Sequence, residues 1–119
     1  MKEEKVFIPS GGIQLEGLLS IQEAHSFRGG VICCHPHPQH GGTMNNKVVY
    51  TLYQTFVRRG FSTLRFNFRG VGRSQGEYDQ GIGELSDAAA ALDYLQTLNP
   101  NSKHCWVAGF SFGAWIGMQ

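Results

Sequence analysis

Apolar residues recur along this chain with two different periods, and these periods predict its secondary structure. Short runs in which every position or every second position is apolar indicate β-strands, whereas apolar residues three or four apart indicate amphipathic helices. The pattern predicts five strands, over residues 5–8, 13–21, 30–34, 61–68 and 103–108. It also predicts two helices, one over about 46–59 and one from 82 or 83 to about 98.

The order of these elements indicates the fold class. The first two strands flank the turn Ser10-Gly11-Gly12 and should form an antiparallel hairpin. The run 30–34 is apolar throughout, as is typical of a parallel strand that is covered on both faces. Strands and helices then alternate, which favours a mostly parallel sheet with right-handed crossovers. We predict an α/β fold that forms a single domain over residues 1–119.

The two helices should each bury one face. Asn45 or Thr43 is the expected N-cap of the first helix. The apolar positions expected to face the core are Val48, Val49, Leu52, Tyr53 and Phe56 in the first helix, and Leu85, Ala88, Leu92 and Leu95 in the second. Three acidic residues flank the second helix or lie on it, and we expect them to be solvated or to act as caps: Asp79, Asp87 and Asp93.

Composition excludes several classes of protein. The chain of 119 residues is 41% hydrophobic and 16% charged, and its net charge is +1. A charge near zero gives no electrostatic basis for binding nucleic acid or a membrane. Cys33, Cys34 and Cys105 lie in apolar runs and do not suggest a disulfide framework, and we expect them to be reduced and buried. With neither a signal peptide nor a membrane span in the sequence, a cytoplasmic location is expected.

The last predicted strand leads into a G-x-S-x-G motif. Residues 109–113 read Gly-Phe-Ser-Phe-Gly, with Ser111 at the centre. In a nucleophile elbow the chain turns sharply from a strand into a helix at the serine, and Gly109 and Gly113 supply the small neighbours that this turn needs. The turn exposes the serine Oγ and directs backbone N–H groups toward a developing oxyanion. Ser111 is therefore the candidate nucleophile.

The loop at residues 35–43 follows a buried strand and reads His-Pro-His-Pro-Gln-His-Gly-Gly-Thr. Pro36 and Pro38 have no N–H, so His37 carries the only amide hydrogen between His35 and Gln39. We predict that the backbone N–H groups of His37 and Phe112 form an oxyanion hole. A second interpretation uses the imidazoles of the loop, because His35, His37 and His40 have a spacing suited to zinc.

Together these motifs resemble the α/β-hydrolase superfamily, and more narrowly its dienelactone-hydrolase-like and esterase-like bacterial members. The stretches that carry the resemblance are residues 35–38, 41–44, 46–49, 64–74 and 109–113. The resemblance implies a serine hydrolase that acts on carboxylic esters or related acyl bonds of small molecules, without a cofactor. It also implies the spatial strand order 1-2-4-3-5.

The sequence departs from that family after the motif. The superfamily places an acid and then a histidine after the serine, and residues 112–119 contain neither. The resemblance thus implies a truncated, N-terminal part of the fold that is inactive by itself. A third interpretation is a non-catalytic fragment that binds a partner through an open sheet edge. Such an edge would also allow self-association.

Overall fold

In the computed structural model, residues 3–22, 29–98, 104–109 and 116 are described. Five strands form one sheet: β1 (Glu4–Ser10), β2 (Ile13–Ser20), β3 (Gly30–Cys34), β4 (Ser62–Phe66) and β5 (Cys105–Gly109). The helices are α1 (Lys47–Arg58), α2 (Ile82–Leu98) and the 3-10 turn η2 (Pro38–His40). Among the described residues, no helix is both long enough and apolar enough to cross a membrane.

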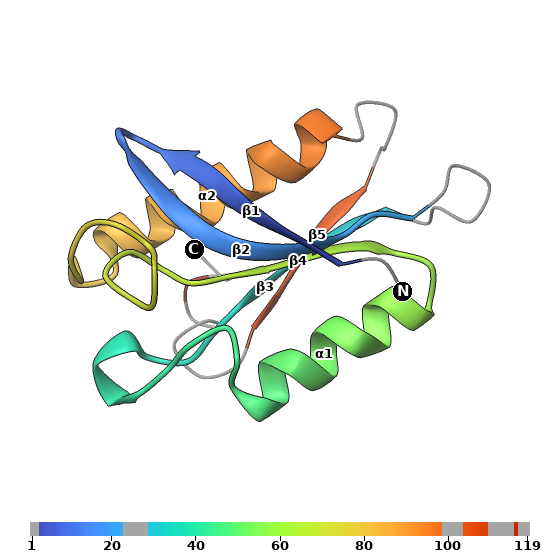
Figure 1. The fold of residues 1–119 in the computed structure, drawn as a ribbon, viewed down its shortest axis with the longest axis horizontal. Coiled ribbons are helices and arrows are strands. Elements are labelled where there is room, and N and C mark those ends of the chain that lie inside the picture. Colours follow the sequence, from blue (N-terminus) through green and yellow to red (C-terminus); the bar gives the residue numbers. More distant parts are fainter. Residues whose placement is uncertain (1–2, 23–28, 99–103, 110–115, 117–119) are drawn as a thin grey trace.

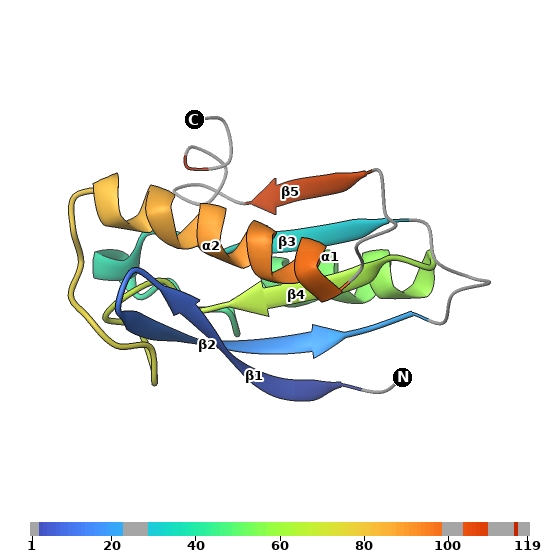
Figure 2. The ribbon, with the colours of Figure 1, turned by 90° about the horizontal axis from the view of Figure 1, so that it is seen from above.

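The strands lie in the order β1-β2-β4-β3-β5, as Figure 2 shows. The pairs β1–β2 and β2–β4 are antiparallel, and β3 pairs in parallel with both β4 and β5. The predicted hairpin, the parallel part of the sheet and the strand order are all confirmed. The sheet of five strands flanked by helices has the architecture of the N-terminal part of an α/β hydrolase.

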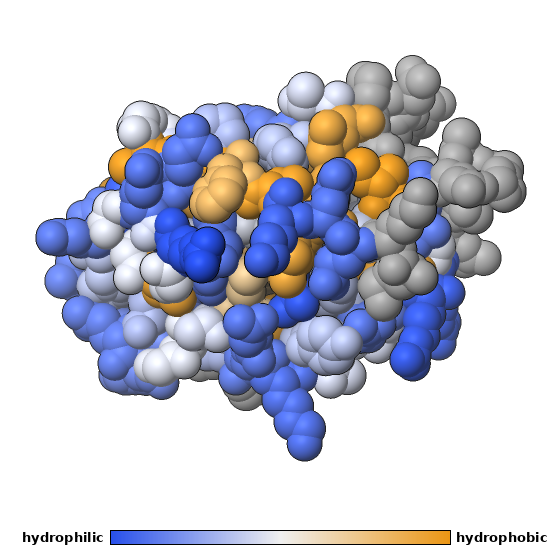
Figure 3. Space-filling model, in the orientation of Figure 1, coloured by the Kyte–Doolittle hydropathy of each residue, from blue (hydrophilic) through white to orange (hydrophobic). Residues whose placement is uncertain are grey.

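The two helices cover opposite faces of the sheet (Figure 1). Successive residues of β3 point to opposite faces, so that Ile32 packs in the cluster that contains Leu95 of α2, whereas Val31 packs against α1. On the α1 side the core consists of Val31, Cys33, Val49, Tyr53 and Val57. The surface seen in Figure 3 is mostly hydrophilic, with small apolar areas between polar ones.

Several element boundaries and faces differ from the predictions. The N-cap of α1 is Asn46, whose Oδ1 accepts from the amides of Val48 and Val49, rather than Asn45 or Thr43. Val48 is 40% exposed because Val49, Tyr53 and Val57 point to the core, and Val48 is rotated by about 100° from Val49. Leu85 is likewise 40% exposed, since the buried face of α2 contains Glu84 and Asp87 in its first turns instead of Leu85.

Strand β4 ends earlier than predicted, at Phe66 rather than at residue 68. The amide of Phe68 donates to the ring of His35 instead of to a backbone carbonyl, at 3.0 Å. The amide of Asn67 still reaches a backbone acceptor, the carbonyl of Glu16. The sheet ladder therefore gives way to side-chain contacts at the edge where the candidate site lies.

Candidate active site

The histidine-containing loop and the G-x-S-x-G motif leave the sheet from neighbouring strands. Strand β3 ends at Cys34 and β5 ends at Gly109, and these two residues are partners in the parallel ladder. Adjacent strands lie about 4.8 Å apart. The predicted site residues Ser111, Phe112 and Gly113 lie outside the described residues, whereas Gly109 and His37 lie within them. The two motifs therefore start side by side at the carboxyl edge of the sheet.

The histidine-containing loop forms a tight turn centred on His37. The amides of His40 and Gly42 both donate to the His37 carbonyl at 3.0 Å, and the amide of Gln39 donates to His37 Nδ1 at 3.1 Å. A side chain at residue 42 is excluded, because a Cβ there would lie 2.0 Å from the carbonyl oxygen of Pro36. Gly41 has a φ of 81°, in the left-handed region that favours glycine. The turn thus holds His37 in a defined position at the sheet edge.

His35 connects the ends of two strands. It is fully buried, and its Nε2 accepts from the amide of Phe68 at 3.0 Å while Nδ1 lies 2.7 Å from the carbonyl oxygen of Pro36. The amide can only donate, so the proton of the neutral ring sits on Nδ1 and is donated to Pro36. Burial lowers the pKa of His35 to about 4, against the opposing effect of the Pro36 carbonyl. His35 is therefore a neutral residue that joins β3 to the segment after β4.

The ring contacts argue against the zinc interpretation. Both ring nitrogens of His35 are engaged by backbone groups, and Nδ1 of His37 accepts from Gln39. The rings of His37 and His40 are stacked with their centroids 4.5 Å apart, which does not aim two nitrogens at one point. Within the described parts of the chain, which include all three histidines, no group of three potential ligands is placed to hold a metal ion.

Tyr78 is a neighbour of His37 that the sequence analysis did not identify. Its hydroxyl oxygen lies 3.2 Å from His37 Nε2, and the two ring centroids are 5.2 Å apart. Tyr78 belongs to the glycine-rich segment between β4 and α2. It lies 41 residues after His37 in the sequence. No local pattern in that segment indicates a contact with the histidine-containing loop, because the contact depends on how the two segments fold over the sheet edge.

The expectation that Asp87 is solvated is wrong. Asp87 is fully buried and accepts from the Arg69 amide at 2.9 Å, the Arg69 Nη2 at 2.9 Å and the Ser10 Oγ at 2.8 Å. A buried carboxylate needs such partners to offset the loss of hydration. Asp79 and Asp93 are exposed, as expected. The Asp87 carboxylate therefore joins α2 to β1 and to the segment after β4.

A second polar network supports the end of the histidine-containing loop. Asn67 Oδ1 accepts from the amide of Met44 at 2.8 Å, and Asn67 Nδ2 donates to Glu16 Oε1 at 2.7 Å. The amide of Arg73 donates to the same carboxylate oxygen at 2.8 Å. A Cβ at Gly72 would lie 2.6 Å from both the side-chain Nδ2 of Asn67 and Oε1 of Glu16, so the chain passes close to this network. The network connects the end of the loop with β2.

The family model for X-Pro dipeptidyl-peptidases of the S15 family matches residues 20–119. The chain belongs to this family. Membership places it among the α/β hydrolases, as its motifs and its sheet order also indicate. The narrower resemblance to dienelactone-hydrolase-like members stays a prediction.

Solved structures and a curated relative resemble this S15-family chain. A protein of unknown function from Agrobacterium tumefaciens, named as a candidate α/β hydrolase, is 59% identical with a TM-score of 0.93, and the match covers 98% of this chain and 53% of that protein. An α/β serine hydrolase homologue from Coxiella burnetii is 47% identical with a TM-score of 0.83, covering 98% and 56%. An uncharacterized protein from Rickettsia prowazekii (strain Madrid E) is 60% identical over 85 residues, which cover 71% of this chain and 36% of that protein.

The S15-family chain thus spans about half the length of these solved structures and about a third of the Rickettsia protein. Their names describe hydrolases of the α/β serine type or proteins without a described activity. The activity, substrates and partners of the whole protein are therefore proposed below.

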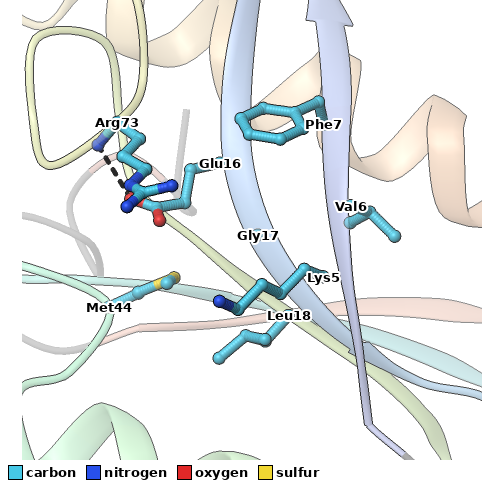
Figure 4. Close-up of a pocket in the computed structure, with 8 residues that line it drawn as sticks. All are labelled: Lys5, Val6, Phe7, Glu16, Gly17, Leu18, Met44 and Arg73. Carbon is cyan, nitrogen blue, oxygen red and sulfur yellow. Dashed lines mark hydrogen bonds between the residues drawn. The ribbon is translucent and has the colours of Figure 1, made fainter.

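A pocket of about 180 Å³ lies on a different part of this S15-family chain, beside β1 and β2 (Figure 4). Its charged lining residues are Lys5, Glu16 and Arg73, and the dashed line in Figure 4 marks the bond from the Arg73 amide to Glu16. Neither His37 nor Gly109, the predicted site residues that the structure describes, lines it. The pocket instead borders the polar network, which contributes Glu16, Arg73 and Met44 to its lining.

Proposed function

We propose that this protein is a serine hydrolase of carboxylic esters or related acyl bonds, with Ser111 as its nucleophile. The observation that carries the proposal is the pairing of Cys34 with Gly109 in the parallel ladder between β3 and β5. Ligands of open α/β sheets bind beyond the carboxyl ends of the strands. The pairing brings the start of the G-x-S-x-G motif beside the start of the histidine-containing loop, as a nucleophile and its oxyanion hole require.

The proposed reaction proceeds by acyl transfer. Ser111 Oγ attacks the carbonyl carbon and forms a bond to it, while its proton passes to a general base. The carbonyl oxygen becomes an oxyanion, which accepts from the backbone N–H groups of His37 and Phe112. When the intermediate collapses, the bond to the leaving group breaks and the leaving group takes the proton from the base. Water then cleaves the ester to Ser111 and releases the carboxylic acid product. In this proposal the base and its acid come from the part of the fold that the relatives have and this chain does not span.

The type of acyl bond that is hydrolysed is to be identified by testing substrates of several classes. The matching family is named for peptidases that release X-Pro dipeptides, and peptide and ester hydrolysis share the same tetrahedral intermediate. Substrates to test are therefore p-nitrophenyl esters of short and medium acids, a thioester, a lactone and an X-Pro dipeptide amide.

The first experiment measures labelling by a fluorophosphonate and ester hydrolysis, with the product of the full reading frame. We expect labelling of Ser111 in the wild type, and loss of both labelling and activity in Ser111→Ala. Absence of labelling in the wild type would overturn the proposal and favour a non-catalytic role in binding a partner through the sheet edge.

A matched pair of variants tests the proposed oxyanion donor. His37 has a φ of −52°, which proline also adopts, so His37→Pro removes the amide hydrogen without requiring a change of this angle. His37→Ala removes the ring and keeps the amide hydrogen. Loss of one such donor lowers kcat by roughly 10²–10³-fold, so we expect His37→Pro to be far less active than His37→Ala. Equal activity of the two variants would exclude the His37 amide from the oxyanion hole.

A further inference from the structure

The strongest unassigned feature of the molecule is the contact between Tyr78 and the His37 ring. Tyr78 lies in the segment between β4 and α2, and its hydroxyl oxygen lies 3.2 Å from His37 Nε2. Both residues are half-buried, and their rings are tilted by 38° with centroids 5.2 Å apart. The pair therefore joins the histidine-containing loop to the segment that precedes α2.

The hydrogen bonds around the ring define which atom donates. The amide of Gln39 donates to His37 Nδ1, so Nδ1 carries the lone pair and the proton of the neutral ring is on Nε2. Nε2–H therefore donates to the hydroxyl oxygen of Tyr78. One ring nitrogen is fixed by the loop itself and the other by a residue from a distant segment.

The segment that carries Tyr78 is hydrogen-bonded to α2. The amide of the next residue, Asp79, donates to Glu84 Oε2 at 2.8 Å, and the amide of Gly81 donates to Glu84 Oε1 at 2.8 Å. Glu84 is fully buried in the first turn of α2. A continuous series of contacts therefore runs from α2 through Glu84 and Asp79 to Tyr78 and the His37 ring.

We propose that Tyr78 is a positioning residue for the oxyanion hole, which rests on the function proposed above. A shift of His37 as a whole would move its amide hydrogen away from a substrate, and it would also displace both the ring and the carbonyl of His37. The carbonyl is held by the amides of His40 and Gly42, and the ring by Gln39 and Tyr78. By holding the ring, Tyr78 keeps the amide hydrogen preorganised, and preorganised donors give most of their benefit in the transition state.

The test compares Tyr78→Phe with the wild type in the product of the full reading frame. Phenylalanine keeps the aromatic ring and removes the hydroxyl. Loss of one neutral hydrogen bond that acts on the transition state should lower kcat for an ester about fivefold, with KM changed less than twofold. The melting temperature, measured in parallel, should change by only a few degrees.

Tyr50→Phe is the matched control. The Tyr50 hydroxyl oxygen accepts from Gln54 Nε2 at 2.6 Å on the exposed side of α1, so the substitution removes one tyrosine hydrogen bond that lies within α1 and involves no residue of the loop. We expect kcat of Tyr50→Phe to equal that of the wild type. A fall in kcat as large as that of Tyr78→Phe would show that the effect is not specific to the loop, and it would overturn the proposal.

A double-mutant cycle decides whether Tyr78 acts through the His37 ring. In a His37→Ala background the ring is absent, so Tyr78→Phe should cause no further loss of kcat. An equal loss in both backgrounds, or full activity of the single variant, would overturn the positioning role while leaving the hydrolase proposal intact. Activity of Ser111→Ala would instead overturn the hydrolase proposal, and the role of Tyr78 with it.

Discussion

Single residues at the carboxyl edge of the sheet act through contacts that their local sequence does not reveal. His35 and His37 are two residues apart in one motif, yet His35 is buried between two strand ends while His37 faces Tyr78. The sequence placed both in one candidate group, because residue type and spacing are the same whichever way each ring turns. The difference arises from the Phe68 amide, which offers His35 a buried donor.

The buried His35 leads to a prediction about acid stability. Burial lowers its pKa in the folded protein to about 4, whereas the unfolded chain binds the proton near pH 6.5. Between these values the unfolded state binds more protons, so His35 makes no contribution above pH 6.5 and destabilises the fold as the pH falls toward 4. Glutamine at this position can still accept from Phe68 but does not titrate.

We therefore expect the wild type to lose roughly 2.5 kcal/mol more unfolding free energy than His35→Gln between pH 7 and pH 4.5. Denaturant titrations of both proteins at the two pH values measure this difference. Identical pH dependence in the two proteins would show that the His35 ring is not held neutral by burial.

At the scale of elements, hydrophobic periodicity predicted which strands and helices form, whereas the contacts between elements decided which face of each helix is buried. The bounds of β3 and α2 agree with the predictions, because an unbroken apolar run and a long 3.6-residue period are strong signals. The inward face of α2 was predicted less well, since Asp87 points to the core although an acidic residue favours solvent. Arg69 and Ser10, distant in sequence, supply the partners that make its burial possible.

Two substitutions on α2 test this structural role of Asp87. Asp87→Ala leaves Arg69 without its carboxylate and should lower the unfolding free energy by roughly 2–3 kcal/mol, near the low end for buried pairs because the Arg69 side chain is 20% exposed. Asp93→Ala changes the same residue type at an exposed position of the same helix, and we expect an effect within about 0.5 kcal/mol. Chemical denaturation of both variants provides the comparison, and equal effects would contradict the role of Asp87.

At the scale of the whole molecule, β5 forms one border of the sheet. Among the described residues, β5 pairs only with β3, and Trp106 and Val107 are 47% and 39% exposed. A strand edge with unpaired backbone groups and exposed apolar side chains readily pairs with another chain. Self-association through this edge, expected from the sequence, thus stays a prediction that the exposure of β5 supports.

We expect the 119-residue chain to increase in mean mass with concentration in sedimentation velocity. Val107→Lys places a charge on β5 and should reduce this association. Ile82→Lys makes the same kind of change at a position that is 73% exposed on α2, and should leave the association unchanged. A wild type that sediments as a monomer at all concentrations would contradict self-association through β5.

By itself the sequence determined the α/β class, the elements and the strand order through the family resemblance. It also identified Ser111 and the histidine-containing loop as candidate chemistry, because periodicity and short motifs are local properties of the chain. Only the tertiary structure decided that Cys34 and Gly109 are ladder partners at one edge, that Asp87 is buried, and that Tyr78 reaches His37. These contacts join segments tens of residues apart, and they exist only once the crossovers have brought the strand ends together.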